Sequence, residues 1–379
     1  MSTELIPRAL ETQLDALLTP GRVLTIHGPR RVGKTTLVRR VAERFDGRVF
    51  YGVGDDMDLR RLLESERLEQ IVSLFRGYDL VVLDEAQRVG NAGTALKMLV
   101  DALPEARVIA TGSSSFHLAR KVGAPLTGRQ HTRLLFPLWS GELAGAYGRP
   151  KLLGGLDNLL VYGCYPEAVT APNVADKRDY LLGLRDSYLF RDILELDNVR
   201  NAAKLQDLLA LLAFQIGKDV SLSELGGSLG IAKQTVERYL DLLEQTFIVR
   251  RVRGFSRNLR KEVTKSARYY FWDNGVRNAV INNFAPLARR NDVGMLWENF
   301  LFFERLKRNA YTGRSVTYHF WRTYDQKELD LVEECDGALA GYEFKYTRPR
   351  RSPPGLWLQT YPDATADTVT RDNWLEFVS

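Results

Sequence analysis

The chain has 379 residues, of which 45% are hydrophobic and 26% charged, and its formal net charge is +6 at pH 7. This composition describes a globular protein, and the length exceeds that of one ordinary core, so we expect two or three domains. No apolar run reaches the length of a transmembrane helix, so we expect no membrane partner. The mild basic excess permits a nucleic-acid or acidic partner without requiring one.

The two cysteines, Cys164 and Cys335, lie far apart in the sequence and lack metal-ligating neighbours. We expect both to be buried free thiols in a reducing compartment. The first residues lack the apolar core of a signal peptide, so we expect a cytoplasmic protein.

An amphipathic helix is expected over residues 8–18, followed by a buried strand over Val23–Ile26. Residues 28–35 then fit the pattern G-x-x-x-x-G-K-(S/T), which is the phosphate-binding loop or Walker A motif. With Thr36, these residues form the predicted nucleotide-binding set: Gly28, Pro29, Arg30, Arg31, Val32, Gly33, Lys34 and Thr35.

The residue types at these positions suit phosphate chemistry. Gly28 and Gly33 let backbone N–H groups turn toward phosphate oxygens. Lys34 supplies a positive charge to the β- and γ-phosphates, and the hydroxyl of Thr35 is available to Mg²⁺. The helix that begins here directs the positive end of its dipole at the nucleotide. We therefore expect ATP and Mg²⁺ as ligands.

Two carboxylates follow the next strongly apolar strand. After a strand at residues 48–51 and a polar loop over 52–56, residues 80–87 form a buried strand that ends in Asp84 and Glu85. Open α/β sheets bind ligands at this end of their strands. Asp84 is expected to organise Mg²⁺, and Glu85 to orient and deprotonate the attacking water, which favours hydrolysis over phosphoryl transfer.

A further strand is expected over residues 107–114, with Thr111 and Ser113 as candidates for sensing the γ-phosphate. A plain strand-to-helix turn is the alternative. Residues 125–133 are expected to form a loop that carries Arg129 and Arg133. Arg129 is our candidate for a catalytic arginine supplied in trans to a neighbouring subunit, and an ordinary surface arginine is the alternative.

Helical patterns replace the α/β alternation from residue 137 to about 215, and a helix-turn-helix pattern with a wing follows. A capping box at Ser221–Glu224 begins its first helix, Gly230 makes the turn, and Ile231–Gln245 make the second helix. Residues 247–253 are expected to form the wing strand.

Polar and basic side chains gather at the start of the second helix and along the wing, where DNA phosphates and bases would lie. The candidates for DNA contact are Lys233, Gln234, Arg238, Arg250, Arg251, Arg253, Arg257 and Arg260. The basic run continues to Arg268, and the interleaved Phe255, Tyr269 and Tyr270 suit stacking. The alternatives are a module that only packs inside a larger ATPase and a basic face that is only solvated.

Residues 328–345 predict two alternating strands around an Asp336-Gly337 turn. A period of two places Glu343 and Lys345 on one face, where Asp330 of the neighbouring strand can join them. A helix over residues 294–300 can add Glu298. These residues could hold a divalent cation and hydrolyse phosphodiesters, and the alternative is an exposed hairpin with ordinary alternating charge.

The ordered set of motifs resembles a prokaryotic family of AAA-type ATPases fused to a C-terminal region with a restriction-endonuclease-like, PD-(D/E)XK, domain. The motifs are the Walker A loop, LDEAQ at 83–87, TGSSS at 111–115, LTGR at 126–129, GCYPE at 163–167, YLFRDI at 188–193, YYFWDNGVR at 269–277, GMLWENF at 294–300, FWR at 320–322, ELDLV at 328–332 and YEFK at 342–345. The resemblance implies an AAA+ core, a helical lid, a winged helix and a nuclease-like end domain. Hexamers are common among such motors.

We therefore predict an α/β protein with a P-loop AAA+ parallel sheet over residues 1–136 and a helical lid over 137–215. A winged helix would occupy 216–268 and a nuclease-like α/β domain 269–379. The leading hypothesis is a homo-oligomeric ATPase, hexameric by analogy, that couples hydrolysis to binding and remodelling or movement of DNA, with branched DNA among the candidates. The alternatives are an ATP-gated DNA nuclease and a nucleotide-controlled switch that acts on a protein partner.

Overall fold

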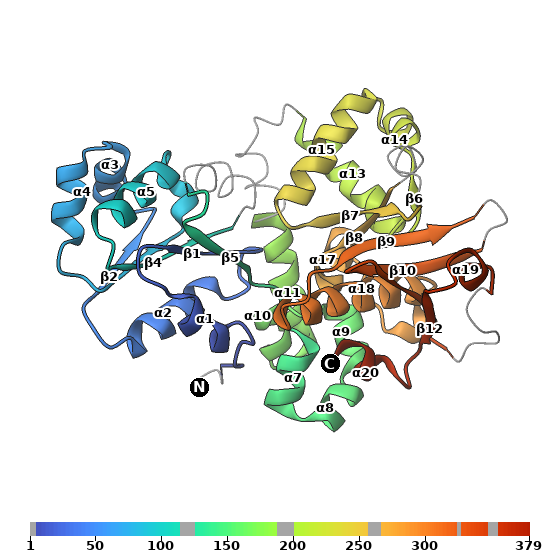
Figure 1. Ribbon diagram of the computed structural model, residues 1–379. Coiled ribbons are helices and arrows are strands. Elements are labelled where there is room, and N and C mark those ends of the chain that lie inside the picture. Colours follow the sequence, from blue (N-terminus) through green and yellow to red (C-terminus); the bar gives the residue numbers. More distant parts are fainter. Residues whose placement is uncertain (1–4, 114–125, 188–200, 257–266, 324–326, 348–354) are drawn as a thin grey trace. The chain divides into compact units, whose positions relative to one another are not determined.

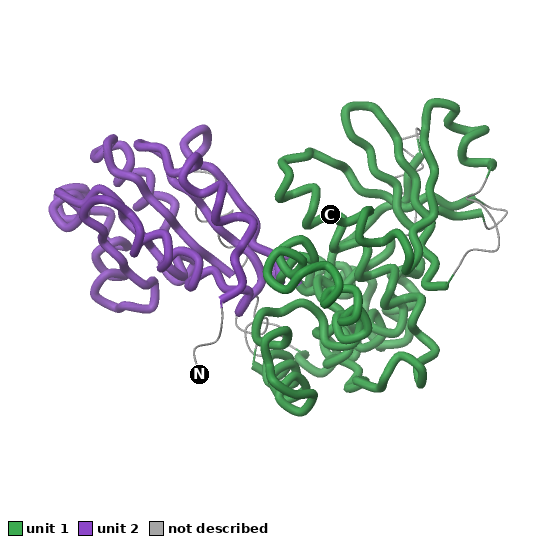
Figure 2. The backbone as a smooth tube through the Cα atoms, turned by 90° about the horizontal axis from the view of Figure 1, so that it is seen from below, with its two compact units in different colours: residues 1–4, 138–244, 248–379 green, residues 5–137, 245–247 purple. Residues whose placement is uncertain are grey.

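The computed structural model describes residues 5–113, 126–187, 201–256, 267–323, 327–347 and 355–379 (Figure 1). The predicted motif residues Ser114, Ser115 and 188–193, and the predicted DNA contacts Arg257 and Arg260, lie outside these ranges. The chain divides into two compact units (Figure 2). We call residues 5–137 with 245–247 the N-terminal unit, and residues 138–244 with 248–379 the C-terminal unit.

The N-terminal unit is built on a five-stranded, fully parallel sheet with the order β2-β3-β4-β1-β5. Its strands are β1 (Val23–His27), β2 (Val49–Val53), β3 (Leu80–Asp84), β4 (Arg107–Gly112) and β5 (Gln130–Leu134). The central strands β1, β3 and β4 are almost wholly buried, as parallel strands covered on both faces should be. Because β1 and β3 both run parallel to β4, their carboxyl ends lie at the same edge of the sheet.

Helices cover both faces of this sheet (Figure 1). They are α1 (Glu11–Leu17), α2 (Lys34–Arg44), α3 (Met57–Glu64), α4 (Leu68–Phe75), the 3₁₀ turn η1 (Ala86–Arg88) and α5 (Ala92–Ala102). The helix α2 buries Leu37, Val38 and Val41, which are spaced as one face of a helix requires. The polar loop predicted at 52–56 is present only over residues 54–56, because β2 continues through Gly52 and Val53. Within the loop, Asp56 caps α3 by accepting from the N–H groups of Asp58 and Leu59.

One predicted loop is wrong. Residues 130–134 form the edge strand β5, which pairs in parallel with β1 from Val23↔Gln130 to His27↔Leu134. The alternation QHTRL lacks an apolar run because an edge strand of a sheet is only half covered. The local sequence therefore gave little indication of a strand.

The C-terminal unit contains a seven-stranded mixed sheet with the order β12-β11-β10-β9-β7-β8-β6. Its strands are β6 (Asp219–Val220), β7 (Val249–Gly254), β8 (Ala267–Phe271), β9 (Thr317–Arg322), β10 (Glu328–Cys335), β11 (Ala338–Phe344) and β12 (Thr365–Val369). The predicted hairpin is confirmed: β10 and β11 pair antiparallel, and both Asp336 and Gly337 have positive φ, as a two-residue type I′ turn requires.

The helices of this unit are α7 (Ser140–Tyr147), α8 (Arg149–Gly154), α9 (Leu156–Tyr162), α10 (Pro166–Thr170), α11 (Val174–Leu184), α13 (Ala202–Phe214), α14 (Leu222–Leu229), α15 (Lys233–Gln245), α17 (Asn274–Val280), η4 (Leu287–Arg289), α18 (Val293–Tyr311), α19 (Gly355–Thr360) and α20 (Trp374–Val378). Those from α7 to α13 precede the first strand of the sheet in the sequence, and the others lie between or after its strands. The long helix α18 runs along the sheet (Figure 1) and buries Trp297, Phe300 and Phe303. No helix in the described ranges is long and apolar enough to span a membrane.

The expected helix-turn-helix elements are present as α14 and α15, with Ser221 capping α14 by accepting from the N–H of Glu224. The strands that follow, β7 and β8, are not a separate wing, because β7 also pairs with β9 at Arg253↔His319. The predicted boundary at 268/269 consequently falls inside β8 of one continuous sheet. The local pattern predicted a strand at residues 247–253 but not that it would join the distant strand β9.

The two cysteines are free, as expected. Cys164 is buried, whereas Cys335 is only partly buried because it ends β10 beside the exposed turn. The prediction that both thiols are buried is therefore wrong for Cys335.

Candidate functional site

The loop between β1 and α2 has the backbone shape that the Walker A pattern predicts. Gly28 has φ +151°, and a Cβ added there would lie 2.2 Å from the carbonyl oxygen of Leu135. Gly33 has φ +100° and caps α2 in the left-handed region. Arg31, with φ 60°, also adopts this region, which is uncommon for a residue with a side chain. The two glycines are thus needed for close approach and for the sharp turn into the helix.

The side chain of Lys34 is folded back onto this loop. Its Nζ donates to the carbonyl oxygens of Gly28 at 2.9 Å and Pro29 at 2.8 Å, and the residue is 5% exposed. Burial lowers the pKa of Lys34 to about 8, against the opposing charges of Glu85 and Asp84. Burial, assisted by the charge of Lys34, also lowers the pKa of the neighbouring His27 to about 4. Lys34 therefore lies in the electrostatic field of both predicted carboxylates.

A second cation, Arg8, holds the loop from its other side. Its Nη1 donates to the carbonyl oxygen of Val32 and its Nη2 to that of Phe136, both at 2.6 Å. Arg8 is 8% exposed, so both hydrogen bonds are buried. Because Val32 lies inside the Walker A loop, Arg8 fixes part of the backbone that would face phosphate.

Asp84 ends β3 and is held by two hydroxyl groups. Tyr51 donates to its Oδ2 at 3.0 Å, and Thr111 donates to its Oδ1. The Thr111 hydroxyl also accepts from the backbone N–H of Glu85 at 3.1 Å. Burial and then the charge of Asp84 raise the pKa of Tyr51 to about 12, so Tyr51 stays a donor. Thr111 thus joins the predicted γ-phosphate sensor strand to the carboxylate of Asp84 and to the backbone of Glu85.

Glu85 adopts φ 54°, a conformation that a non-glycine residue rarely takes and that clusters at functional sites. Gln87 donates through its Nε2 to the Glu85 carboxylate and to the hydroxyl of Ser113 at 3.1 Å. The oxygen Oε1 of Gln87 is buried and accepts no hydrogen bond from the residues that the structure describes. Hydrogen bonds through Gln87 therefore link the Glu85 carboxylate to the second predicted sensor, Ser113.

The residues present fit a magnesium nucleotide. Gly28 leaves a backbone cradle that a Cβ would fill, and Lys34, Thr35 and Thr36 form the first turn of α2, where N–H groups lack helical acceptors. The hydroxyl of Thr35 and the carboxylate of Asp84 are the hard oxygen donors that Mg²⁺ prefers. This pair of oxygen donors is therefore suited to one Mg²⁺ ion.

Arg129 lies beside the start of β1, whereas the Walker A loop follows the end of that strand. Its carbonyl oxygen accepts from the N–H of Val23, at the start of β1, and its side chain forms an ion pair with Asp101. It cannot reach the nucleotide site of its own N-terminal unit from there, so any catalytic role would have to be in trans. Arg133 lies on β5 and donates to the carbonyl oxygen of Thr132.

The four predicted nuclease-like residues converge in the C-terminal unit. Asp330 of β10 lies across from Glu343 of β11, since Leu331 pairs with Tyr342, and its Oδ2 accepts from the N–H of Phe344 at 2.7 Å. Lys345 forms an ion pair with Glu343 at 2.9 Å. Glu298 of α18 accepts from the hydroxyl of Tyr270 at 2.7 Å. The pairing of β10 with β11 and the ion pair thus place Asp330, Glu343 and Lys345 beside one another, and their role as a nuclease-like site with Glu298 stays a prediction.

The carboxylates of Glu298 and Asp330 are costly to ionise. Burial, followed by the charge of Asp330, raises the pKa of Glu298 to about 8. Burial raises the pKa of Asp330 to about 6 despite the hydrogen bond from Phe344. Within the described ranges, however, no group of three or more His, Cys, Asp or Glu side chains is arranged to hold a metal ion.

The basic residues predicted to contact DNA fall into two sets. Lys233, Gln234 and Arg238 are exposed on α15, and Arg253 is exposed on β7, as expected. Arg251 instead pairs with Asp241 at 3.3 Å and Glu244 at 3.4 Å.

Arg250 is also turned inward, and its guanidinium lies 5.7 Å from the ring centroid of Tyr318. Consecutive residues of β7 point to opposite faces of the sheet, and on each face the guanidinium finds a partner in its own unit.

The predicted continuation of the basic face is wrong at Arg268, and its residues from 257 to 266 lie outside the described ranges. Arg268 is 3% exposed and bonds Asp219 at 3.0 Å and Glu328 at 2.9 Å. The aromatic residues expected to stack on bases are in the core, with Phe255 5%, Tyr269 3% and Tyr270 0% exposed. Arg268 and Tyr270 lie on the inner strand β8, so their side chains contact other residues of the same unit and not solvent.

Sequence reasoning missed Arg8, Gln87 and Tyr51 as site residues. Gln87 stood inside the quoted LDEAQ motif, so its proximity to Glu85 was a usable signal. Tyr51 ends the segment predicted as the second strand, beside the expected ligand edge. Arg8 gave no signal, because a single arginine that precedes the loop by about twenty residues carries no local pattern.

Family models match three consecutive parts of the chain. One described as AAA domain matches residues 20–144, and one described as Domain of unknown function (DUF8612) matches residues 154–287. A third, described as Domain of unknown function (DUF4143), matches residues 293–356. The AAA match covers the whole constellation around Lys34, Asp84 and Glu85.

Relatives span most of the chain. The uncharacterized protein Rv2008c of Mycobacterium tuberculosis is 30% identical over 329 residues, which cover 86% of this chain and 70% of that protein. The uncharacterized protein Mb2031c of Mycobacterium bovis matches to the same extent. An uncharacterized protein of Methanocaldococcus jannaschii is 21% identical over 363 residues, covering 91% of this chain and 80% of its own length.

Two solved structures align over long stretches with low scores. A Signal Transduction ATPase with Numerous Domains protein from Pyrococcus horikoshii has 12% identity and a TM-score of 0.30, and the alignment covers 80% of this chain and 46% of that one. A chain of Drosophila ORC bound to DNA has 13% identity and a TM-score of 0.25, with coverage of 71% and 91%. Scores this low carry no argument about fold or function.

Proposed function

The chain belongs to the family of the uncharacterized mycobacterial proteins Rv2008c and Mb2031c and carries an AAA ATPase domain, and from this premise we propose a homo-oligomeric ATPase that couples ATP hydrolysis to the binding and remodelling or movement of DNA. The observation that carries the ATPase part is the assembly of Lys34, Asp84 and Glu85. Lys34 begins α2 after the end of β1, and the two carboxylates lie at the end of the parallel strand β3, so Lys34 experiences the charge of both carboxylates.

Each residue has a definite task in hydrolysis. Lys34 binds phosphate oxygens in exchange for the Gly28 and Pro29 carbonyls that it now contacts. Thr35 and Asp84 would hold Mg²⁺, which when bound neutralises charge on the phosphate oxygens. Glu85 orients the attacking water and accepts its proton, while Gln87 and Ser113 keep its carboxylate in place. Thr111 keeps Asp84 and the Glu85 backbone in register.

The DNA part of the proposal is supported by exposed polar and basic residues on α15 and β7. Lys233, Gln234 and Arg238 begin α15, while Val236, Tyr239 and Leu240 of the same helix are buried. The core face is therefore occupied and the basic face is open, which is the arrangement of a helix that contacts a phosphate backbone.

ATP hydrolysis should be measured with no DNA and with single-stranded, duplex and four-way-junction DNA. E85Q is the control and should bind ATP but hydrolyse it at least ~10²-fold more slowly. Stimulation by one DNA structure, lost in a K233A/R238A variant, supports the proposal and identifies the substrate. Robust hydrolysis that no DNA alters would favour the switch that acts on a protein partner. Near wild-type turnover in E85Q would remove the assignment of the base.

A DNA nuclease timed by ATP is the second candidate, favoured by the register that sets Asp330 opposite Glu343 with Lys345 beside them. Metal-dependent cleavage should be assayed with Mg²⁺ and Mn²⁺ on the same DNA panel. Metal-dependent cleavage that D330A abolishes, and whose rate in the wild type changes when ATP is added, would support this candidate. Absence of cleavage under every condition would reject it.

A further inference from the structure

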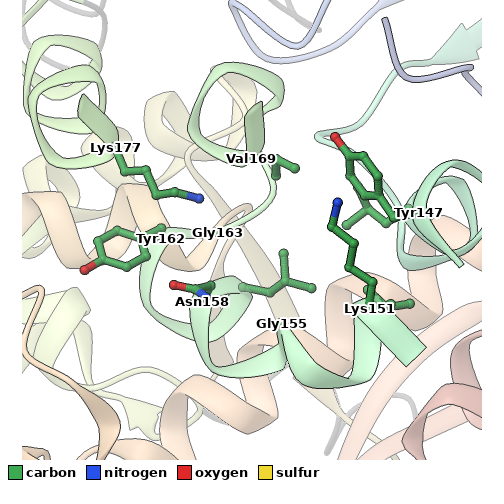
Figure 3. A pocket seen from close by; sticks show the side chains of 11 residues that line it. Tyr147, Lys151, Gly155, Asn158, Tyr162, Gly163, Val169 and Lys177 are labelled. Carbon is green, nitrogen blue, oxygen red and sulfur yellow. The ribbon is translucent and has the colours of Figure 1, made fainter. Parts of the chain in front are cut away.

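A cavity of about 190 Å³ lies among the helices of the C-terminal unit, away from the residues discussed so far. It opens to solvent and is lined by residues of α7, α8, α9, α10 and α11 (Figure 3). Its walls are mainly apolar, formed by Leu143, Leu152, Leu159 and Val169 with the rings of Tyr147 and Tyr162. Neither the ATPase constellation nor the carboxylate cluster contributes a side chain to it.

Two ammonium groups point into this space from different helices. Figure 3 shows Lys151 of α8 and Lys177 of α11 extending toward it from opposite sides. The Nζ of Lys151 lies 4.3 Å from the ring centroid of Tyr147, and that of Lys177 lies 5.9 Å from the ring centroid of Tyr162. Within the described residues, neither lysine has a carboxylate within 4.0 Å.

Lys177 is the more informative of the two because it is only partly exposed. Burial lowers the pKa of its ammonium group, and no carboxylate among the residues that the structure describes opposes that effect. A partly desolvated cation without a counter-ion is unfavourable, and an anion that entered the cavity would compensate for the lost hydration. The aromatic ring of Tyr162 provides only part of that compensation.

We propose that this cavity binds a small organic carboxylate, whose apolar body contacts the leucine and valine walls and whose carboxylate pairs with Lys177 and Lys151. Size supports a compact ligand, since a cavity of about 150 Å³ accommodates one benzene molecule. The present cavity therefore has room for a six-membered ring and one carboxylate. Asn158, which also lines it, offers a further amide donor.

Sodium phenylacetate is a suitable probe, and binding to the full chain should be measured by isothermal titration and ligand-observed NMR. We expect saturable binding with a dissociation constant between about 10 µM and 1 mM, as ligand efficiencies allow for ten non-hydrogen atoms. Phenylacetamide, which keeps the shape and loses the charge, should bind at least about tenfold more weakly.

Three variants locate the site. K177Q should weaken phenylacetate binding at least about tenfold, and V169F, which fills the cavity, should abolish it. K97Q, which neutralises an exposed lysine of α5 in the N-terminal unit, should leave binding unchanged. Circular dichroism checks that each variant is folded. The proposal is overturned if phenylacetate and hexanoate both fail to bind up to ~10 mM, if folded K177Q and V169F bind like the wild type, or if the amide binds as tightly as the carboxylate.

Discussion

Replacing Arg8 by alanine should weaken nucleotide binding although Arg8 is outside the Walker A motif. The guanidinium donates two buried hydrogen bonds of 2.6 Å, to the carbonyl oxygens of Val32 and Phe136. A hydrogen bond from a charged donor contributes about 1.5–3 kcal/mol. Loss of the bond to Val32 alone would destabilise the nucleotide-binding conformation of the loop by that free energy. Because about 1.4 kcal/mol corresponds to a factor of ten, R8A should bind ATP about 10- to 100-fold more weakly.

The assay is titration with a fluorescent ATP analogue and Mg²⁺, at a temperature where circular dichroism shows the variant to be folded. The unfolding midpoint should be measured in parallel, since R8A also leaves two buried carbonyl groups unpaired. R8K keeps the charge but can span only one of the two carbonyls, so it should fall between R8A and the wild type.

R22A is the matched control, because it removes an exposed arginine of the same N-terminal unit. A folded R8A that binds ATP within twofold of the wild type would refute the reasoning. A lower unfolding midpoint with unchanged affinity would show that Arg8 stabilises the unit without positioning the loop.

Three further outcomes are expected. ATP affinity should fall about tenfold between pH 7 and pH 9, because only the protonated form of Lys34, whose pKa is about 8, attracts phosphate; a flat profile in a titration series contradicts this. Q87A should lower kcat about tenfold with unchanged ATP affinity, since Gln87 contacts the Glu85 carboxylate and not the predicted phosphate loop; steady-state kinetics decide.

Glu298 should make stability fall as pH rises from about 4.5 to about 8, because its folded pKa lies above its usual value of 4.5 and ionisation then opposes folding. E298Q keeps the acceptor for Tyr270 and should flatten this dependence, so its melting temperature should gain on the wild type between pH 5 and pH 8. Parallel melting curves at all pH values would show that Glu298 does not titrate in this range.

Local patterns were sufficient wherever a function depends on consecutive residues. The Walker A loop needs glycines and a lysine at fixed spacing, and Gly28 and Gly33 do adopt the backbone angles that their positions imply. The hairpin around Asp336-Gly337 was predictable for the same reason, since two residues with positive φ define the turn. Asp84 and Glu85 were placed correctly because a buried apolar run ends immediately before them.

Prediction failed where a side chain's partner lies far away in the sequence. Arg268 read as part of a basic surface, yet it is buried between Asp219 and Glu328, which are 49 and 60 residues distant. Tyr270 read as a residue that stacks on bases, yet it stacks on Phe302 with ring centroids 4.5 Å apart. No local pattern in the sequence of β8 indicated that this strand lies inside a seven-stranded sheet.

The sequence by itself determined the phosphate loop, the two carboxylates after β3 and the hairpin of β10 and β11, because backbone conformation and burial of a short run depend on neighbouring residues. Only the tertiary structure decided that Arg8 braces the loop, that β7 joins β9, and that Lys151 and Lys177 face one cavity. These features depend on which segments pack together, and packing is a balance of burial and pairing over the whole chain that no local spacing encodes.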